Sequence, residues 1–428
     1  MTEAEAHRAI EAVWRIESVR LIAGLARMTG DVGAAEDLAQ DALTAALERW
    51  PDDGVPDNPG AWLMATAKRR AIDELRRNRM LERKHEQLGH ELEEQRERAV
   101  PDLDAALDDP IGDDVLRLIF TACHPVLATE ARVALTLRLV GGLTTDEIAR
   151  AFLTPRATIQ QRIVRAKRSL AAAQVPFEVP RGAELGARLG SVLEVIYLVF
   201  NEGYSATAGD EWLRPELCDD ALRLARVLAE LMPAEAEVQG LLALLEIQSS
   251  RTRARRGKGG EPIVLLEQDR ATWDPLLIGR GLAALARAAE LSGRGTGSAG
   301  KALGPYALQA EIAACHARAH SAEETDWTRI VALYDALAQI TPSPVVELNR
   351  AVALAYAFGP AAGLEVLDAL VAEGSLGEYH LLPAVRGDLL ARLGRFAEAR
   401  AELQRAAALT RNVRERELLR TRRESLGA

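Results

Sequence analysis

The residues best suited to chemistry in this sequence are basic and amide side chains that could contact a nucleic acid. They gather in residues 142–170, GLTTDEIARAFLTPRATIQQRIVRAKRSL, whose second half predicts an amphipathic helix from Pro155 to Leu170. Gln can pair with adenine and Arg with guanine in the major groove of DNA. The expected DNA-contacting residues on the outer side of this helix are Arg156, Thr158, Gln160, Gln161, Val164, Arg165 and Arg168.

A shorter helix is expected just before it, and together the two form a helix-turn-helix. Thr144 or Thr145 can cap the first helix, and Leu153 and Thr154 make the turn. Pro155 suits the first position of the second helix, where its missing N–H costs nothing. The residues expected to face inward are Ile148, Ala149 and Phe152 in the first helix and Ile159, Ile163, Ala166 and Leu170 in the second.

A second basic surface is expected on a helix from Pro59 to Asn78. Its apolar side holds Met64, Ala67, Ala71 and Leu75, and the opposite side suits phosphate groups. The preceding helix, about Gly33 to Trp50, is acidic on its polar side, which indicates a different partner. The basic side consists of Thr66, Arg69, Arg70, Asp73, Arg76 and Arg77, and the acidic helix offers Asp37, Gln40 and Asp41.

Charge is distributed unevenly along the chain. Lys68–Lys84 holds eight basic and three acidic side chains, a net charge of +5, and Arg156–Leu170 holds five basic and no acidic ones. Residues 91–114 between them hold ten acidic and two basic side chains, a net charge of −8. This pattern predicts two small basic modules joined by an acidic linker, with solvated helix faces as the alternative interpretation.

The C-terminal half is rich in Ala and Leu and predicts two further helical domains, residues 184–290 and 303–422. Ser292–Gly304 indicates a flexible connector, and the basic segment Arg251–Gly260 favours a solvated loop over a nucleic-acid contact. Gly359 and Gly394 lie 35 residues apart in similar segments, close to the 34-residue tetratricopeptide period. We therefore expect tetratricopeptide-like repeats, with an ordinary helical bundle as the alternative.

Composition sets the fold class and excludes several functions. With 48% hydrophobic, 27% charged and only 4% aromatic residues, the chain predicts an all-α protein. It has no apolar run long enough for a membrane span and no signal peptide, so we expect a cytoplasmic protein. Cys315, His316 and His320 suggest a metal site on a helix, but no further ligand is near. Without a phosphate-binding loop or a catalytic triad, we expect no enzyme, no metal and no cofactor.

Three stretches together resemble a known family. AEDLAQDALTAALERWP and NPGAWLMATAKRRAIDELRR resemble region 2, and LTTDEIARAFLTPRATIQQRIVRAKRSL resembles region 4, of the extracytoplasmic-function (ECF) sigma factors of the sigma-70 family. The C-terminal half, with NEGYSA at 201–206 and LLEQDRATWD at 265–274, resembles the ECF group that carries a tetratricopeptide-containing extension. The resemblance implies region 2 at 5–85, an acidic linker at 86–112 and region 4 at 113–173.

The resemblance also implies partners and roles. Asp37, Gln40 and Asp41 would bind the β′ subunit of core RNA polymerase, whose β and β′ subunits are the expected partners. The linker would run toward the active-site and RNA-exit region of the polymerase. The basic side of the Pro59–Asn78 helix would bind the promoter −10 element and the Pro155–Leu170 helix the −35 element. Residues 51–58 would lie where a base is flipped out of the duplex. The C-terminal extension would regulate the factor and its repeats would bind a protein or peptide.

Two departures and two alternatives accompany this interpretation. Arg69 stands where the family usually has Asn, and the turn of the helix-turn-helix lacks the usual Gly. A helix-turn-helix regulator with a repeat-containing sensor domain is one alternative, and it would bind palindromic sites as a dimer. An enzyme that uses residues 184–290 is the other, and it would show turnover or a retained ligand.

Overall fold

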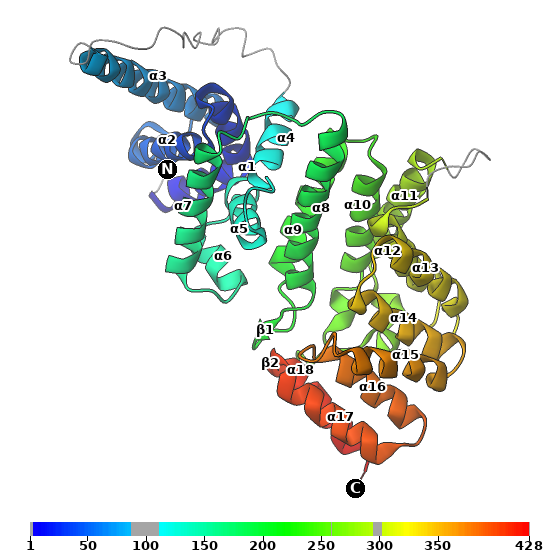
Figure 1. The fold of residues 1–428 in the computed structure, drawn as a ribbon. Coiled ribbons are helices and arrows are strands. Elements are labelled where there is room, and N and C mark those ends of the chain that lie inside the picture. Colours follow the sequence, from blue (N-terminus) through cyan, green and yellow to red (C-terminus); the bar gives the residue numbers. More distant parts are fainter. Residues whose placement is uncertain (1–2, 87–110, 258, 294–301, 428) are drawn as a thin grey trace. The chain divides into compact units, whose positions relative to one another are not determined.

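The computed structural model describes residues 3–86, 111–257, 259–293 and 302–427. The fold is all-α, as predicted (Figure 1). It divides into two compact units, Met1–Val195 and Ile196–Ala428, which are described separately. The predicted linker 86–112 and connector Ser292–Gly304 fall largely outside the described residues.

The first unit contains the predicted region 2 and region 4. Its helices are α1 (Glu3–Thr29), α2 (Val32–Asp53), α3 (Pro59–Glu86), α4 (Ile111–Ala122), α5 (Thr129–Leu139), α6 (Thr145–Ala151), α7 (Arg156–Ala172) and the first part of α8 (Ala183–Tyr204).

Helices α1, α2 and α3 pack on one another around small and aromatic side chains. Trp50 is fully buried and its ring meets that of Trp62 edge to face, with 5.3 Å between the centroids, so this pair packs the helices together. Helix α2 continues through Pro51 to Asp53 and ends where Gly54 adopts a positive φ. The first three residues of the segment 51–58 are therefore helical, because a proline in the last turn removes only one hydrogen bond.

The helix-turn-helix is formed by α6 and α7. Thr144 caps α6 in a reciprocal capping box with Glu147, so the first of the two candidate threonines is the cap. Leu153 makes the turn at a φ of +46°, a left-handed conformation that glycine usually supplies. Pro155 precedes α7 instead of opening it, and Phe152 ends α6 half-buried. The other predicted inward residues are confirmed as buried: Ile148, Ala149, Ile159, Ile163, Ala166 and Leu170.

The second unit continues from α8 through a run of paired helices. These are α9 (Pro215–Leu231), α10 (Ala236–Ser249), α11 (Pro275–Leu291), α12 (Pro305–Arg318), α13 (Trp327–Ile340), α14 (Pro344–Ala357), α15 (Pro360–Glu373), α16 (Leu381–Arg392), α17 (Phe396–Leu409) and α18 (Val413–Ser425). Short 3-10 turns η2 (Arg253–Arg255), η3 (Leu265–Glu267) and η4 (Arg270–Thr272) connect α10 to α11.

Helices α13 to α18 each pack on the next, as in a stack of helical hairpins (Figure 1). Gly359 and Gly394 lie at the turns of the α14–α15 and α16–α17 pairs, and both have a positive φ. The 35-residue step seen in the sequence therefore matches a repeated helix pair. Each pair buries its apolar side on its neighbours, which is how helical repeats gain stability.

Two short strands tie the C-terminal end of the second unit to its first residues. β1 (Ala208–Gly209) and β2 (Arg411–Asn412) pair in parallel. The fully buried Asn412 donates hydrogen bonds to the backbone oxygens of Ala206 and Glu211, at 3.2 and 2.9 Å. Residues some 200 positions apart thus hold the second unit together.

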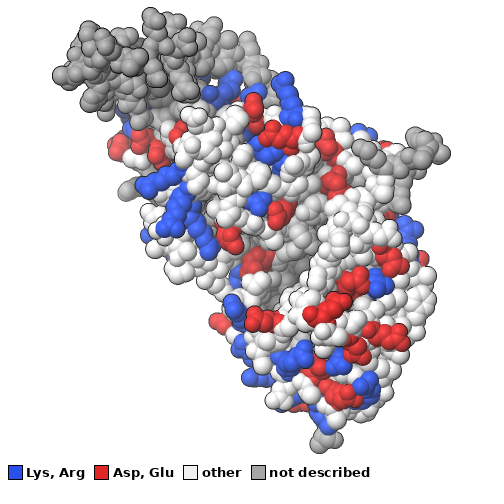
Figure 2. All heavy atoms as spheres, viewed as in Figure 1, with Lys and Arg blue, Asp and Glu red and all other residues white. Residues whose placement is uncertain are grey.

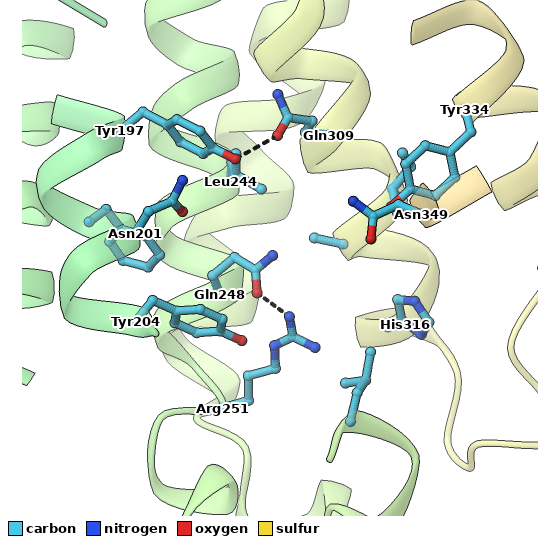
Figure 3. A pocket seen from close by; sticks show the side chains of 14 residues that line it. Tyr197, Asn201, Tyr204, Leu244, Gln248, Arg251, Gln309, His316, Tyr334 and Asn349 are labelled. Carbon is cyan, nitrogen blue, oxygen red and sulfur yellow. Dashed lines mark hydrogen bonds between the residues drawn. The ribbon is translucent and has the colours of Figure 1, made fainter. Parts of the chain in front are cut away.

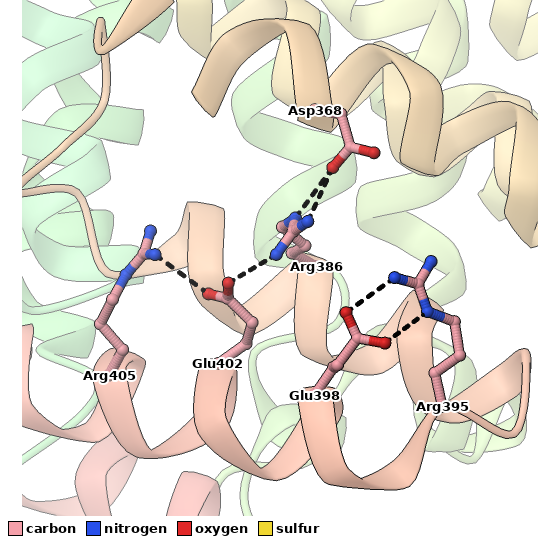
Figure 4. Close-up of polar contacts among 6 residues, drawn as sticks. All are labelled: Asp368, Arg386, Arg395, Glu398, Glu402 and Arg405. Atoms are coloured by element: carbon pink, nitrogen blue, oxygen red, sulfur yellow. Dashed lines mark hydrogen bonds and ion pairs between the residues drawn. The ribbon is translucent and has the colours of Figure 1, made fainter. Parts of the chain in front are cut away.

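Helices α15, α16 and α17 are joined by a network of charged side chains (Figure 4). Arg386 contacts Asp368 at 2.8 Å and Glu402 at 2.6 Å, and Glu402 also contacts Arg405 at 3.3 Å. Arg386 and Glu402 are largely buried, so this cation links three helices where water screens charge poorly.

We expect Arg386→Met to lower the free energy of unfolding of the second unit by about 2 kcal/mol, because it leaves Glu402 with only one cation. Arg395→Met is the matched control, since Arg395 pairs with Glu398 in solvent, and it should have no measurable effect. Thermal unfolding of the full chain followed by circular dichroism measures both. Equal transitions for the two variants would argue against the network.

The structure also bears on the suggested metal site and on the basic segment Arg251–Gly260. Helix α12 ends at Arg318, so His320 lies beyond it and does not share a helix face with His316. No group of three potential metal ligands occurs within the described residues, and no helix among them is long and apolar enough to cross a membrane. The segment Arg251–Gly260 is not a solvated loop, because Arg251 and Arg255 are buried under aromatic rings.

Candidate nucleic-acid interface

The outer side of α7 is the first candidate surface. Gln160, Gln161, Val164, Arg165 and Arg168 are exposed, as predicted, and basic side chains gather over this helix in Figure 2. Thr158 is half-buried, and Arg156 is exposed with its Nε 3.2 Å from Asp146. The inner side of α7 is apolar and packed on α5 and α6, so the polar side of the helix faces outward.

The basic side of α3 is the second candidate surface. Arg69 is exposed and Thr66 and Arg70 are half-buried, while the side chains of Asp73, Arg76 and Arg77 lie outside the described residues. All six positions belong to α3. The helix runs eight residues beyond the predicted end at Asn78.

The acidic side of α2 lies next to it. The side chains of Asp37 and Asp41 are 82% and 58% exposed, and Gln40 is half-buried. Asp41 also contacts Arg70 on α3, with 3.0 Å between its Oδ2 and the Nη1 of Arg70. The two surfaces that the sequence assigned to different partners therefore meet along this pair.

A buried carboxylate joins region 2 to region 4. Glu36 on α2 is only 4% exposed, and its Oε1 lies 2.6 Å from the Nε of Arg138 on α5. Its Oε2 lies 2.6 Å from the Nζ of Lys167 on α7, and Lys167 also approaches Asp37 at 3.6 Å. We call Glu36, Arg138 and Lys167 the clasp, because these three side chains connect α2 to α5 and α7.

A second ion pair reinforces this contact. Asp114 on α4 lies 3.1 Å from the Nε of Arg27 on α1 and 2.6 Å from Arg117. Helices α1 and α4 also pack on each other directly. Regions 2 and 4 are thus held together by two sets of charged side chains.

The sequence pattern contains one signal for the clasp residues, which were assigned no role above. The helical period assigns Glu36 to the same side of α2 as Val32 and Ala39, both buried. A carboxylate at such a position needs a cation, and nothing local supplies one. The partners, Arg138 and Lys167, are more than 100 residues away in the sequence.

The start of α8 is anchored to region 4. Arg188 donates a hydrogen bond to the backbone oxygen of Phe120 at 3.0 Å, and Ser191 donates one to that of Cys123 at 2.6 Å. Arg132 on α5 also pairs with Glu194 at 3.0 Å. Burial raises the pKa of the Cys123 thiol to about 11, so this cysteine is an inert packing residue. Region 4 is therefore continuous with the first helix of the extension.

Three successive parts of the chain match known protein families. Residues 16–80 match sigma-70 region 2, residues 117–170 match sigma-70 region 4, and residues 188–289 match a family of unknown function (DUF6596). The uncharacterized protein R00370 of Rhizobium meliloti is 42% identical over 94% of this chain and 92% of its own length. The chain belongs to the family of that protein.

More distant relatives match the N-terminal part alone. The probable ECF RNA polymerase sigma factor SigI of Mycobacterium tuberculosis is 28% identical over 38% of this chain and 55% of its own length. The ECF RNA polymerase sigma factor SigK of Mycobacterium ulcerans is 31% identical over 34% of this chain and 75% of its own length. This chain thus combines matches to sigma-70 regions 2 and 4 with a helical C-terminal part. The DUF6596 match lies within the predicted domain 184–290. Both that domain and the tetratricopeptide assignment stay predictions.

Proposed function

We propose that this chain is an ECF sigma factor that binds core RNA polymerase, recognises promoter −10 and −35 elements and directs transcription initiation. The ordered pair of sigma-70 domains, each with its own exposed polar face, carries this proposal. The polymerase performs the nucleotidyl transfer, and the chain acts as its specificity subunit in the cytoplasm.

Each surface receives one role in this proposal. Asp37, Gln40 and Asp41 bind the β′ subunit, and the basic face of α3 binds the −10 element. On α7, Gln160, Gln161, Arg165 and Arg168 read the −35 element in the major groove. Arg69, which replaces the family's usual Asn, changes the base preference at −10.

The clasp limits how these faces can be used together. The two elements lie about 25 base pairs apart, or roughly 85 Å of duplex. The faces that read them lie on helices joined through α2, and the longest of these, α3, has 28 residues and a length of about 42 Å. We therefore propose that the clasp opens when both elements are bound at once.

The C-terminal extension regulates this factor. Its first helix, α8, is hydrogen-bonded to region 4 through Arg188 and Ser191, so a change in the extension can be felt by the −35 module. The repeated helix pairs are of the tetratricopeptide type and offer a surface to a protein or peptide.

Run-off transcription with purified core polymerase and genomic fragments, including the region upstream of this gene, tests the proposal. We expect specific transcripts only when the full chain is added. Absence of core binding would overturn the proposal and favour the operator-binding regulator.

Arg188→Met in the same assay should change transcript yield, and an unchanged yield would contradict regulation through α8.

A further inference from the structure

The second unit contains a cavity of about 260 Å³ between residues of the DUF6596 part and helices α12 to α14 (Figure 3). Its walls are aromatic rings and side-chain amides, among them Tyr204, Tyr334, Asn201 and Gln309. No Asp or Glu occurs among the described residues that line it.

Arg251 brings a buried positive charge into this cavity. It is 9% exposed, and one of its terminal nitrogens donates a hydrogen bond to the side-chain oxygen of Gln248. Its Nε is buried and has no hydrogen-bond partner. Within the part of the chain that the structure describes, no carboxylate forms an ion pair with Arg251, and the rings of Tyr204 and Trp273 lie 5.6 and 5.9 Å away.

Neighbouring groups add to the positive charge. Arg255 is 8% exposed, also lacks an ion pair among the described residues, and stacks on Tyr204 with 3.6 Å from its Cζ to the ring centroid. Burial lowers the pKa of this guanidinium. Arg270 donates to the backbone oxygen of His316 at 2.7 Å. Buried cations without a carboxylate are costly, and aromatic rings offset only part of that cost.

His316 lies on the opposite side of the cavity from Tyr204 (Figure 3). It is 7% exposed, and its Nδ1 is buried without a hydrogen-bond partner. Burial, with the charges of Arg251 and Arg270, lowers the pKa of His316 to about 3, so the ring is neutral near pH 7. A neutral imidazole ring can donate one hydrogen bond to a molecule in the cavity or accept one from it.

We propose that this cavity binds a small organic carboxylate, with the carboxylate on Arg251 and an apolar or aromatic body between Tyr204 and Tyr334. The planar guanidinium matches a carboxylate in a two-point contact. Arg251 is the one cationic side chain among the described residues that line the cavity. A ligand with one negative charge therefore suits the cavity better than a phosphate group with two. This proposal is independent of the proposed sigma-factor function, because ligand binding is measured on the purified chain without polymerase or DNA.

Isothermal titration of the full chain with benzoate, 4-hydroxybenzoate and phenylacetate tests the proposal. Benzamide, 4-hydroxybenzamide and phenylacetamide are the neutral controls of the same shape. We expect at least one carboxylate to bind and to raise the melting temperature, and its amide to bind at least about thirtyfold more weakly. If all three carboxylates fail to bind, or bind no better than their amides, the proposal is wrong.

Variants of two nearby arginines locate the site. Arg251→Met should abolish carboxylate binding and raise the melting temperature of the ligand-free chain, because it removes an unpaired buried cation. Arg253→Met, an exposed position in the same loop, should change neither. If Arg251 has only a structural role, Arg251→Met lowers the melting temperature and leaves binding intact, which overturns the proposal.

A second variant keeps the test valid if Arg251→Met fails to fold. Asn349 lines the cavity at an exposed position, so Asn349→Ala should fold normally. We expect it to weaken carboxylate binding several-fold through loss of an amide contact. Unchanged binding in this variant would place the carboxylate outside the cavity and contradict the proposal.

Discussion

The double variant Asp37→Lys, Asp41→Lys is expected to abolish promoter-specific transcription while the chain still folds. Both carboxylates are more than half exposed, so neither contributes much to the core of region 2. Removing one partner of a buried, hydrogen-bonded charge pair in an interface costs about 2–5 kcal/mol. Replacing both aspartates with lysine should weaken binding to core polymerase by about 100-fold or more.

The double variant Glu11→Lys, Glu48→Lys is the matched control, because it changes the net charge by the same amount on exposed positions of α1 and α2. It should retain core binding within a few-fold. Fluorescence anisotropy with labelled chain and purified core measures both affinities. Equal affinities of the two double variants would remove these aspartates from the proposed interface.

The helix-turn-helix could be predicted almost residue by residue, because it follows local rules. The cap at Thr144 and the buried residues of α7, such as Ile159 and Ile163, follow from capping chemistry and a 3.6-residue period. These rules act over a few turns of one helix. They also place Arg165 and Arg168 outside, but they do not say what these side chains bind.

Features that depend on distant contacts were missed. The basic segment that begins at Arg251 was interpreted as a solvated loop, since its composition resembles one. In the structure the rings of Tyr204, Trp212 and Trp273, from separate segments, cover Arg251 and Arg255. Local composition cannot show which rings the chain will bring to a guanidinium, so neither the burial nor the cavity could be predicted.

The clasp was missed for the same reason, and it gives the second large expected effect. Glu36→Gln keeps the size of the side chain but removes the charge that holds both Arg138 and Lys167. Breaking a buried ion pair costs about 3–5 kcal/mol. Because the two cations retain some exposure, we expect a loss of about 2 kcal/mol from the closed arrangement, or about a 30-fold shift toward the open one.

Single-molecule energy transfer measures this shift directly. Dyes on cysteines at Glu48 of α2 and Ser169 of α7, both exposed, report whether the two helices are together. Glu36→Gln should raise the ratio of low-efficiency to high-efficiency molecules about 30-fold and raise transcript yield when the chain is limiting. Glu11→Gln, an exposed carboxylate on α1, should leave both readings unchanged. If Glu36→Gln keeps the high-efficiency population, Lys167 and Arg138 do not control opening, and the packing of α1 on α4 must hold the two regions together instead.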